Sequence, residues 1–229
     1  MKTRTRLGAA FVVVFAGASA QATPLLELTP HHLSSAYSSG PQTFTAVGVA
    51  GSDMSVQRFL GSIGLAQFGP PLNSGGGGGT GGFSLSLSVI PSGSHFTGTG
   101  SFTATDLHGD TITASIDNGI WSSAGGDQIF FTGDLSNAQF HNNSGTGIFN
   151  GNTGSFSFGD LLGQSFNGSI VSLTTTATGA GFFTHSFTGG DTGGDAQIQQ
   201  PTVPLPPAAW TGMATLVGVM VVRRLRRDR

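Results

Sequence analysis

Short runs in which apolar and polar residues alternate are the feature that most limits how this chain can fold. Residues 83–89 read Phe-Ser-Leu-Ser-Leu-Ser-Val, which places every apolar side chain on one face of an extended strand. Residues 43–49 alternate in a similar way. Because 18 phenylalanines are set among Gly, Ser and Thr, the composition also favours strands. Further runs of this kind lie at 101–107, 111–116, 128–135, 147–149, 155–158, 165–173 and 182–187.

Turn-forming residues separate these runs. Short strands at this spacing predict a mostly β fold, an antiparallel β-sandwich or a meander. The triplet Phe-Thr-Gly recurs at 96, 131 and 187, but at unequal intervals, whereas a β-helix needs a fixed repeat. The sandwich is therefore the preferred interpretation. The predicted turns, rich in Gly, Asn and Asp, lie at 108–110, 118–119, 125–127, 142–145 and 150–152.

Residues 21–82 are predicted to form an N-terminal part, followed by a β-rich domain at 83–200. Residues 23–40 show no sustained period, so we expect them to be extended or irregular. Residues 54–66 place apolar side chains at helical spacing and predict a short helix. Residues 73–82 contain five consecutive glycines and predict a flexible connection.

The glycine-rich segment is not a phosphate-binding loop. Such a loop needs a lysine beside its last glycine, and the only lysine of this chain is Lys2.

The first 20 residues have the pattern of a secretory signal peptide. Lys2, Arg4 and Arg6 form a basic region, and an apolar stretch follows up to Ala18. Ala18-Ser19-Ala20 is a small-residue cleavage site, so we expect a signal helix at 1–20 that is removed after Ala20, with Ala22 as the alternative.

The C-terminal segment combines a proline motif, an apolar run and a basic end. The motif is Val203-Pro204-Leu205-Pro206, and the apolar run at 208–222 predicts a transmembrane helix. A helix of about 15 residues measures roughly 22 Å, which spans a bilayer if the flanking arginines snorkel. Basic residues after such a helix stay cytoplasmic, so everything before Pro204 is predicted to lie outside. The arginines are Arg223, Arg224, Arg226, Arg227 and Arg229.

This arrangement at 203–229 resembles the PEP-CTERM protein-sorting tail of Gram-negative bacteria, in its Val-Pro-Leu-Pro form. Leu205 stands where the family most often has glutamate. The resemblance implies export through the secretion translocon, then recognition by a membrane-embedded exosortase and cleavage near Pro204. It also implies delivery to the cell surface or extracellular matrix, with exopolysaccharide as a partner. The alternative is an uncleaved, single-pass anchor in the inner membrane.

Without its two ends the chain is strongly acidic. Arg58 is the only Lys or Arg between residues 21 and 203, against ten acidic residues, which gives a net charge of −9 with histidine neutral. A body with one basic side chain cannot neutralise a row of phosphates, so nucleic-acid binding is excluded. The chain has no cysteine, so neither a disulfide nor a thiolate zinc site stabilises it.

No motif in the sequence indicates catalysis, and we predict a non-enzymatic protein. The six histidines show no His-x-x-x-His spacing, and the adjacent His31 and His32 are interpreted as exposed polar residues rather than a metal site. Glu27 is the only glutamate, so a glycosidase pair would have to consist of aspartates.

The sequence leaves two weaker binding hypotheses open, one for calcium and one for carbohydrate. Asp106 and Asp110 flank a turn and are the candidates for calcium, the one cofactor left open, although turn geometry alone explains Asp and Gly there. A carbohydrate-binding β module is the alternative function, with Trp121, Tyr37 or exposed Phe stacking on sugar rings. For Trp121 a role in the core is the preferred interpretation.

Overall fold

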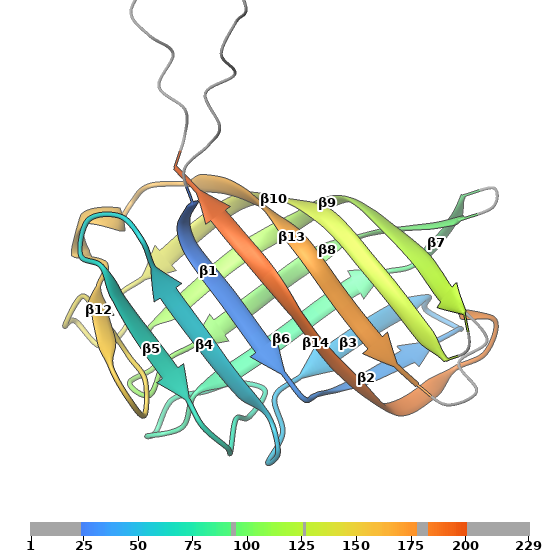
Figure 1. Cartoon of the computed structure of the whole chain (residues 1–229), viewed down its shortest axis with the longest axis horizontal. Coiled ribbons are helices and arrows are strands. Elements are labelled where there is room, and N and C mark those ends of the chain that lie inside the picture. The colour runs from blue at the N-terminus through green and yellow to red at the C-terminus, as the bar shows by residue number, and fades with distance from the viewer. Residues whose placement is uncertain (1–23, 93–94, 126, 178–182, 201–229) are drawn as a thin grey trace, which may run out of the picture.

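The computed structural model describes residues 24–92, 95–125, 127–177 and 183–200 (Figure 1). Their fold is mostly β, as predicted, and all strand pairings are antiparallel. The elements are β1 (Pro24–His31), β2 (Leu33–Ser38), β3 (Thr43–Val47), β4 (Asp53–Arg58), β5 (Gly64–Phe68), β6 (Gly82–Ser88), β7 (Ile90–Ser92), β8 (His95–Thr105), β9 (Thr111–Gly125), β10 (Gln128–His141), β11 (Ile148–Asn150), β12 (Ser155–Ser157), the 3-10 helix η1 (Gly159–Leu161), β13 (Phe166–Thr176) and β14 (Phe187–Gln199).

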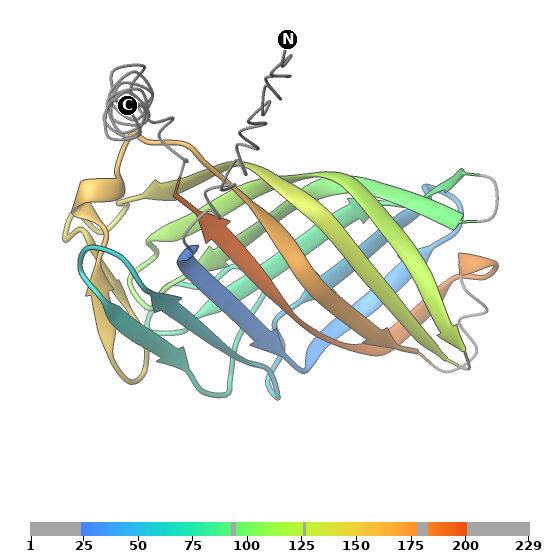
Figure 2. The ribbon, with the colours of Figure 1, turned by 45° about the horizontal axis from the view of Figure 1, so that its top comes forward.

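The main sheet closes on itself. Its strands follow the order β13-β10-β9-β8-β6-β3-β2-β14, and β14 also pairs with β13. In Figures 1 and 2 the near strands cross the far strands at an angle, as expected of a closed and twisted sheet. The strands of this path thus form one closed sheet instead of the two facing sheets of a sandwich. Within it, β8, β9 and β10 follow one another as a meander.

A side extension leaves this closed sheet along β14. The first half of β14 pairs with β2, and its last residues pair with β1, which continues to β4 and β5. The short hairpin of β11 and β12 lies beside β5, where Gln67 bridges to Thr153. The hairpin therefore covers the outer edge of the extension.

Of the two alternatives predicted for 23–40, extended or irregular, the extended one holds, because β1 and β2 lie in this segment. The buried positions in β1 include Leu26 and Leu28, whereas those in β2 are Leu33, Ser35 and Tyr37. His32 lies between the strands with a φ of 54°, and the alternation changes there from even to odd residue numbers. Because the alternation changes phase at this one left-handed residue, no single period of two runs through both strands.

The helix predicted at 54–66 is also absent, because β4 and β5 form an antiparallel pair there. Met54, Val56 and Arg58 are buried in alternation, which is the period of a strand. Gly61, with a φ of 75°, lies in the connection that returns the chain.

The glycine-rich segment at 73–82 is an ordered loop rather than a flexible connection. The side-chain oxygen of Asn73 accepts hydrogen bonds from the Gly75 and Gly76 amides, and the Gly79 amide donates to the Leu107 carbonyl at 2.9 Å. The loop connects β5, in the side extension, to β6, in the main sheet.

Two further predictions are corrected around β9 and β14. Asn118 and Gly119 do not end a strand but lie inside β9, where Asn118 has a φ of 51°. The described part of the run at 182–187 is not a strand until Phe187, where β14 begins. The runs at 43–49, 83–89, 101–107, 111–116, 128–135, 147–149, 155–158 and 165–173 all overlap strands, as predicted.

Aromatic side chains fill the interior of the closed sheet. The Trp121 side chain is fully buried, and its ring centroid lies 4.6 Å from that of Phe131, 4.8 Å from Phe183 and 4.9 Å from Phe44. A cavity of about 20 Å³ lies between Leu85, Phe102 and Ile170. The core role predicted for Trp121 is therefore confirmed.

The predicted signal segment at 1–20 and sorting tail at 203–229, with their cleavage sites, lie outside the described residues. Within the described ranges, no helix has the length and apolar character needed to cross a membrane.

Candidate functional site

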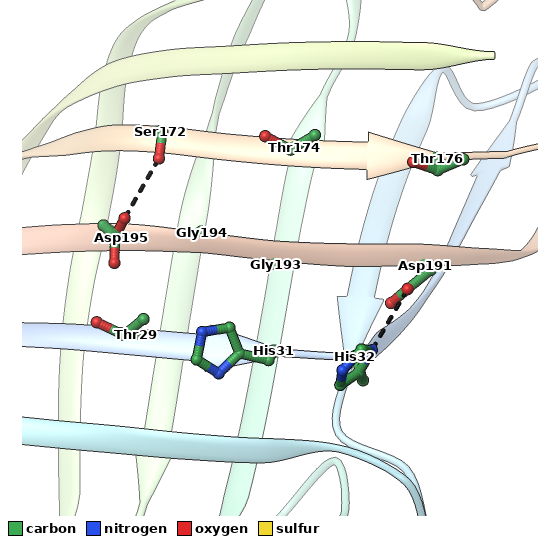
Figure 3. A pocket seen from close by; sticks show the side chains of 10 residues that line it. All are labelled: Thr29, His31, His32, Ser172, Thr174, Thr176, Asp191, Gly193, Gly194 and Asp195. Atoms are coloured by element: carbon green, nitrogen blue, oxygen red, sulfur yellow. Dashed lines mark hydrogen bonds and ion pairs between the residues drawn. The ribbon is translucent and has the colours of Figure 1, made fainter.

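A shallow hollow of about 400 Å³ lies on the outer face of the sheet, across β1, β14 and β13 (Figure 3). Gly193 and Gly194 of β14 lie at its centre and contribute no side chain. We call this hollow the β14 furrow. Its other lining residues are Thr29, His31, His32, Ser172, Thr174, Thr176, Asp191 and Asp195.

Strand register arranges these side chains in rows. On β13, Ser172 is opposite Asp195, Thr174 is opposite Gly193, and Thr176 is opposite Asp191. The intervening Thr192 is buried, and its hydroxyl lies 2.8 Å from that of Thr175. Because alternate residues of a strand face opposite sides, Asp191, Gly193 and Asp195 face outward. The pair of Thr174 and Gly193 therefore leaves a gap on the β14 side, between two neighbouring pairs that each carry a carboxylate.

Histidines and carboxylates form two pairs along the β1 side of the furrow. The Nδ1 atom of His31 lies 2.7 Å from Asp53 Oδ1, and that of His32 lies 3.4 Å from Asp191 Oδ2. Each of these side chains is at least 39% exposed. Exposed pairs of this kind add little to stability, so the groups can exchange partners with a bound molecule at low cost.

A partly exposed aromatic ring lies beside the furrow. Phe130 of β10 is opposite Thr174 of β13, and both neighbours of Phe130 in the chain, Ile129 and Phe131, are buried. Phe130 therefore faces outward, next to the hydroxyl of Thr174 in the strand register. The sequence did not single out this ring, because only the phase of alternation within β10 distinguishes it from the buried phenylalanines.

The furrow offers hydrogen-bond donors and acceptors rather than a metal cage. Within the described ranges, no three His, Asp or Glu side chains gather closely enough to hold a metal ion. His31 and His32 face different carboxylates, in agreement with their interpretation as exposed polar residues. The arrangement suits a ligand that carries many hydroxyl groups.

The calcium candidates Asp106 and Asp110 lie elsewhere, in the turn between β8 and β9, and both are completely buried. Asp106 Oδ1 accepts the amides of His108 and Asp110 at 2.8 Å, and its Oδ2 accepts the Asn150 amide at 2.9 Å. Asp110 accepts the Ser144 amide at 2.6 Å and the Ser144 hydroxyl at 2.7 Å. All four carboxylate oxygens thus accept protein donors, two of which lie in the turn itself and the rest in Ser144 and Asn150.

The two aromatic residues proposed for sugar stacking are inside the protein. Trp121 is 0% exposed and Tyr37 is 4% exposed, and burial raises the pKa of the Tyr37 phenol. Neither ring can therefore form a platform for a sugar in this structure. The hypothesis of stacking on these two residues is corrected, because both belong to the packed core.

Arg58 and Asp160 form an ion pair beside a second hollow, of about 500 Å³, near the ends of β1 and β14. The Arg58 side chain is 1% exposed, and it joins β4 to the segment of η1. Its Nη1 and Nη2 atoms donate to the two Asp160 oxygens at 2.8 and 2.5 Å, and its Nε donates to the Leu60 carbonyl at 2.6 Å. The ion pair connects the side extension to the segment of η1. The hydrogen bonds of Arg58 therefore lie at this second hollow and not at the β14 furrow.

Comparison with known protein families, with curated proteins and with solved structures finds no match to this chain.

Proposed function

We propose that this chain is a non-enzymatic exported protein, sorted through residues 203–229 by a membrane exosortase and delivered to the cell surface or extracellular matrix. In this role the closed sheet is the displayed part, and the two terminal segments serve only its transport. The secretion translocon and the exosortase are its partners during export, and the exopolysaccharide layer is its environment afterwards.

The observation that carries this proposal is the way in which the two ends leave the sheet. Pro24, the first residue of β1, pairs with Gln199, the last residue of β14, so both ends emerge side by side (Figures 1 and 2). Proposed cleavage after Ala20 and near Pro204 would fall outside all the strands that the structure describes. Processing at both sites would therefore leave all the strand pairings in place.

A displayed body without enzymatic activity is also supported by the chemistry of the described residues. Side chains fill the interior, so a ligand has access to the outer face only. The side chains of His31, His32, Asp53 and Asp191 at the β14 furrow are open to water.

The test is the intact mass of the protein recovered from membrane and extracellular fractions of its native host. We expect a released form that begins at Gln21 or Thr23 and ends near Pro204. A variant with Pro204→Ala and Pro206→Ala should stay in the membrane fraction, whereas Pro41→Ala, in the turn before β3, should be released normally. Retention of Arg229 in all wild-type protein would contradict sorting and favour the uncleaved anchor.

A further inference from the structure

We propose that the β14 furrow is a binding site for an uncharged, polyhydroxylated ligand, namely a short stretch of a neutral glycan. This inference concerns the described residues and does not rest on how the termini are processed.

The fold constrains position 193 less than the neighbouring position 194. Gly194 is required by packing, because a Cβ there would overlap the carbonyl oxygen of Ser172. At Gly193 the nearest atom to a Cβ would be the Pro30 carbonyl oxygen at 3.3 Å, and its φ is not in the left-handed region. Glycine inside a strand lowers stability, and it often marks a place where a ligand approaches the backbone.

Polar groups with free hydrogen-bonding capacity surround this gap. Asp195 receives a long hydrogen bond of 3.5 Å from the Ser172 hydroxyl, and Asp191 has the long contact with His32. A carboxylate can accept about four hydrogen bonds, so both groups keep capacity for the hydroxyls of a sugar. The hydroxyl of Thr174, in the row between them, can donate or accept.

Phe130 continues the row of Gly193 and Thr174 onto β10. The carbon-hydrogen face of a sugar ring packs on an aromatic ring, while its hydroxyls turn to polar neighbours. A chain lying along this row would meet both kinds of surface. The furrow volume of about 400 Å³ is in the usual range for sites of small ligands.

The negative charge around the furrow determines which class of ligand can bind there. Asp53, Asp191 and Asp195 surround the furrow, and Arg58, the only Lys or Arg among the described residues, is buried against Asp160. A polyanion would be repelled. Asp191 and Asp195 are four residues apart on one strand, roughly 13 Å, which is too far for both to bind one metal ion. A neutral glycan is the ligand class that fits these groups.

The test is titration calorimetry on the full-length chain in phosphocholine micelles. The probes are cellohexaose, maltohexaose, N-acetylchitohexaose and mannohexaose, with an alginate hexasaccharide as the anionic comparison. We expect at least one neutral hexasaccharide to bind and the alginate fragment not to bind. Gly193→Val fills the gap and should weaken binding at least about tenfold, equivalent to about 1.4 kcal/mol. Phe130→Ser should also weaken it.

The matched control is Ser86→Val, a similar change on the outer face of β6, which should bind as the wild type does. Thermal unfolding confirms that each variant is folded, and Thr174→Val replaces Gly193→Val if the latter is not. The proposal is overturned if none of the four neutral hexasaccharides binds at about 5 mM, or if the furrow variants bind as well as Ser86→Val. A sorting failure in the native host would change neither result.

Discussion

Arg58 is the residue on which the side extension most depends, because it is a buried charge with one acidic partner. Asp160→Asn leaves the guanidinium its carbonyl acceptors but no carboxylate. An uncompensated buried charge is strongly destabilising, although Asp160 itself is 56% exposed and water screens the pair. We expect Asp160→Asn to lower the free energy of unfolding by about 2 kcal/mol at pH 7, measured by urea unfolding.

The same pair predicts a pH dependence. The hydrogen bond from Arg58 is the main cause that lowers the pKa of Asp160 below its ordinary value of 3.8. The folded state therefore binds this proton less readily than the unfolded state, so the stabilisation is present above pH 3.8 and disappears as pH falls through the lower, folded-state pKa. The difference between wild type and Asp160→Asn should shrink below about pH 4. A difference that stays constant down to pH 2.5 would contradict this account.

Gly119 gives a second test at the scale of one residue. A Cβ there would lie 2.5 Å from the Gly98 carbonyl oxygen and closer still to the Phe131 ring. We expect Gly119→Ala to destabilise the protein by about 3 kcal/mol, because the aromatic core has no room to move. Gly51→Ala is the control, since nothing lies within 4 Å of its Cβ, and it should change stability by less than about 0.5 kcal/mol. Equal effects of the two variants would show that the core around Trp121 is loosely packed.

At the scale of elements, the turn between β8 and β9 connects the main sheet to the hairpin of β11 and β12. Asp106→Ala would leave the buried amides of His108, Asp110 and Asn150 without their acceptor. We expect a loss of about 3 kcal/mol in the free energy of unfolding and faster hydrogen exchange at Asn150. Asp106→Asn keeps one side-chain oxygen and should cost less. Normal protection of Asn150 in Asp106→Ala would exclude this role.

Calcium removal distinguishes a turn from an ion site at the same place. Because the four oxygens of Asp106 and Asp110 already accept protein donors, we expect the unfolding temperature to change by less than about 1 °C when EDTA replaces calcium. A clear fall in the unfolding temperature on chelation would restore calcium as the cofactor of this turn.

The sequence predicted strands best where one period runs uninterrupted, as in β3 and β6. It was less definite where a single residue changes the phase, as His32 does between β1 and β2. It failed for β14, because Gly189 to Asp195 has little strand propensity of its own. That segment becomes a strand through pairing with β13 on one side and with β2 and β1 on the other.

The site was less predictable than the elements, for a related reason. The furrow takes His31 from β1, Thr174 from β13 and Gly193 from β14. No local pattern brings together residues from both ends of the chain. The sequence could name Asp106 and Asp110 as a turn because that contact is local, and it could place Trp121 in the core from its apolar neighbour. To predict that Phe130 lies beside the furrow, the register of β10, β13 and β14 would have to be known.

For the whole molecule, closure of the sheet depends on its last strand, β14, which pairs with β2 and with β13. β14 pairs with β13 from Asp191 to Gln199 and with β1 from Ala196 to Gln199. These contacts join residues that are far apart in the sequence, so they form together or not at all. We therefore expect the described body to unfold in one cooperative transition.

The position of a C-terminal cut should then decide whether the sheet survives. A chain ending at Pro204 keeps every pairing of β14, and we expect its unfolding temperature to lie within about 1 °C of the full-length value. A chain ending at Asp195 loses Ala196 and Ile198, whose side chains are buried, and all the pairing of β14 with β1. It should lose the cooperative transition in circular dichroism and the exchange protection of β1. Equal stability of the two truncated chains would mean that residues 196–199 of β14 and their pairing with β1 are not needed for the fold. Loss of folding at Pro204 would mean that the tail is part of the fold and is not a segment removed in transport.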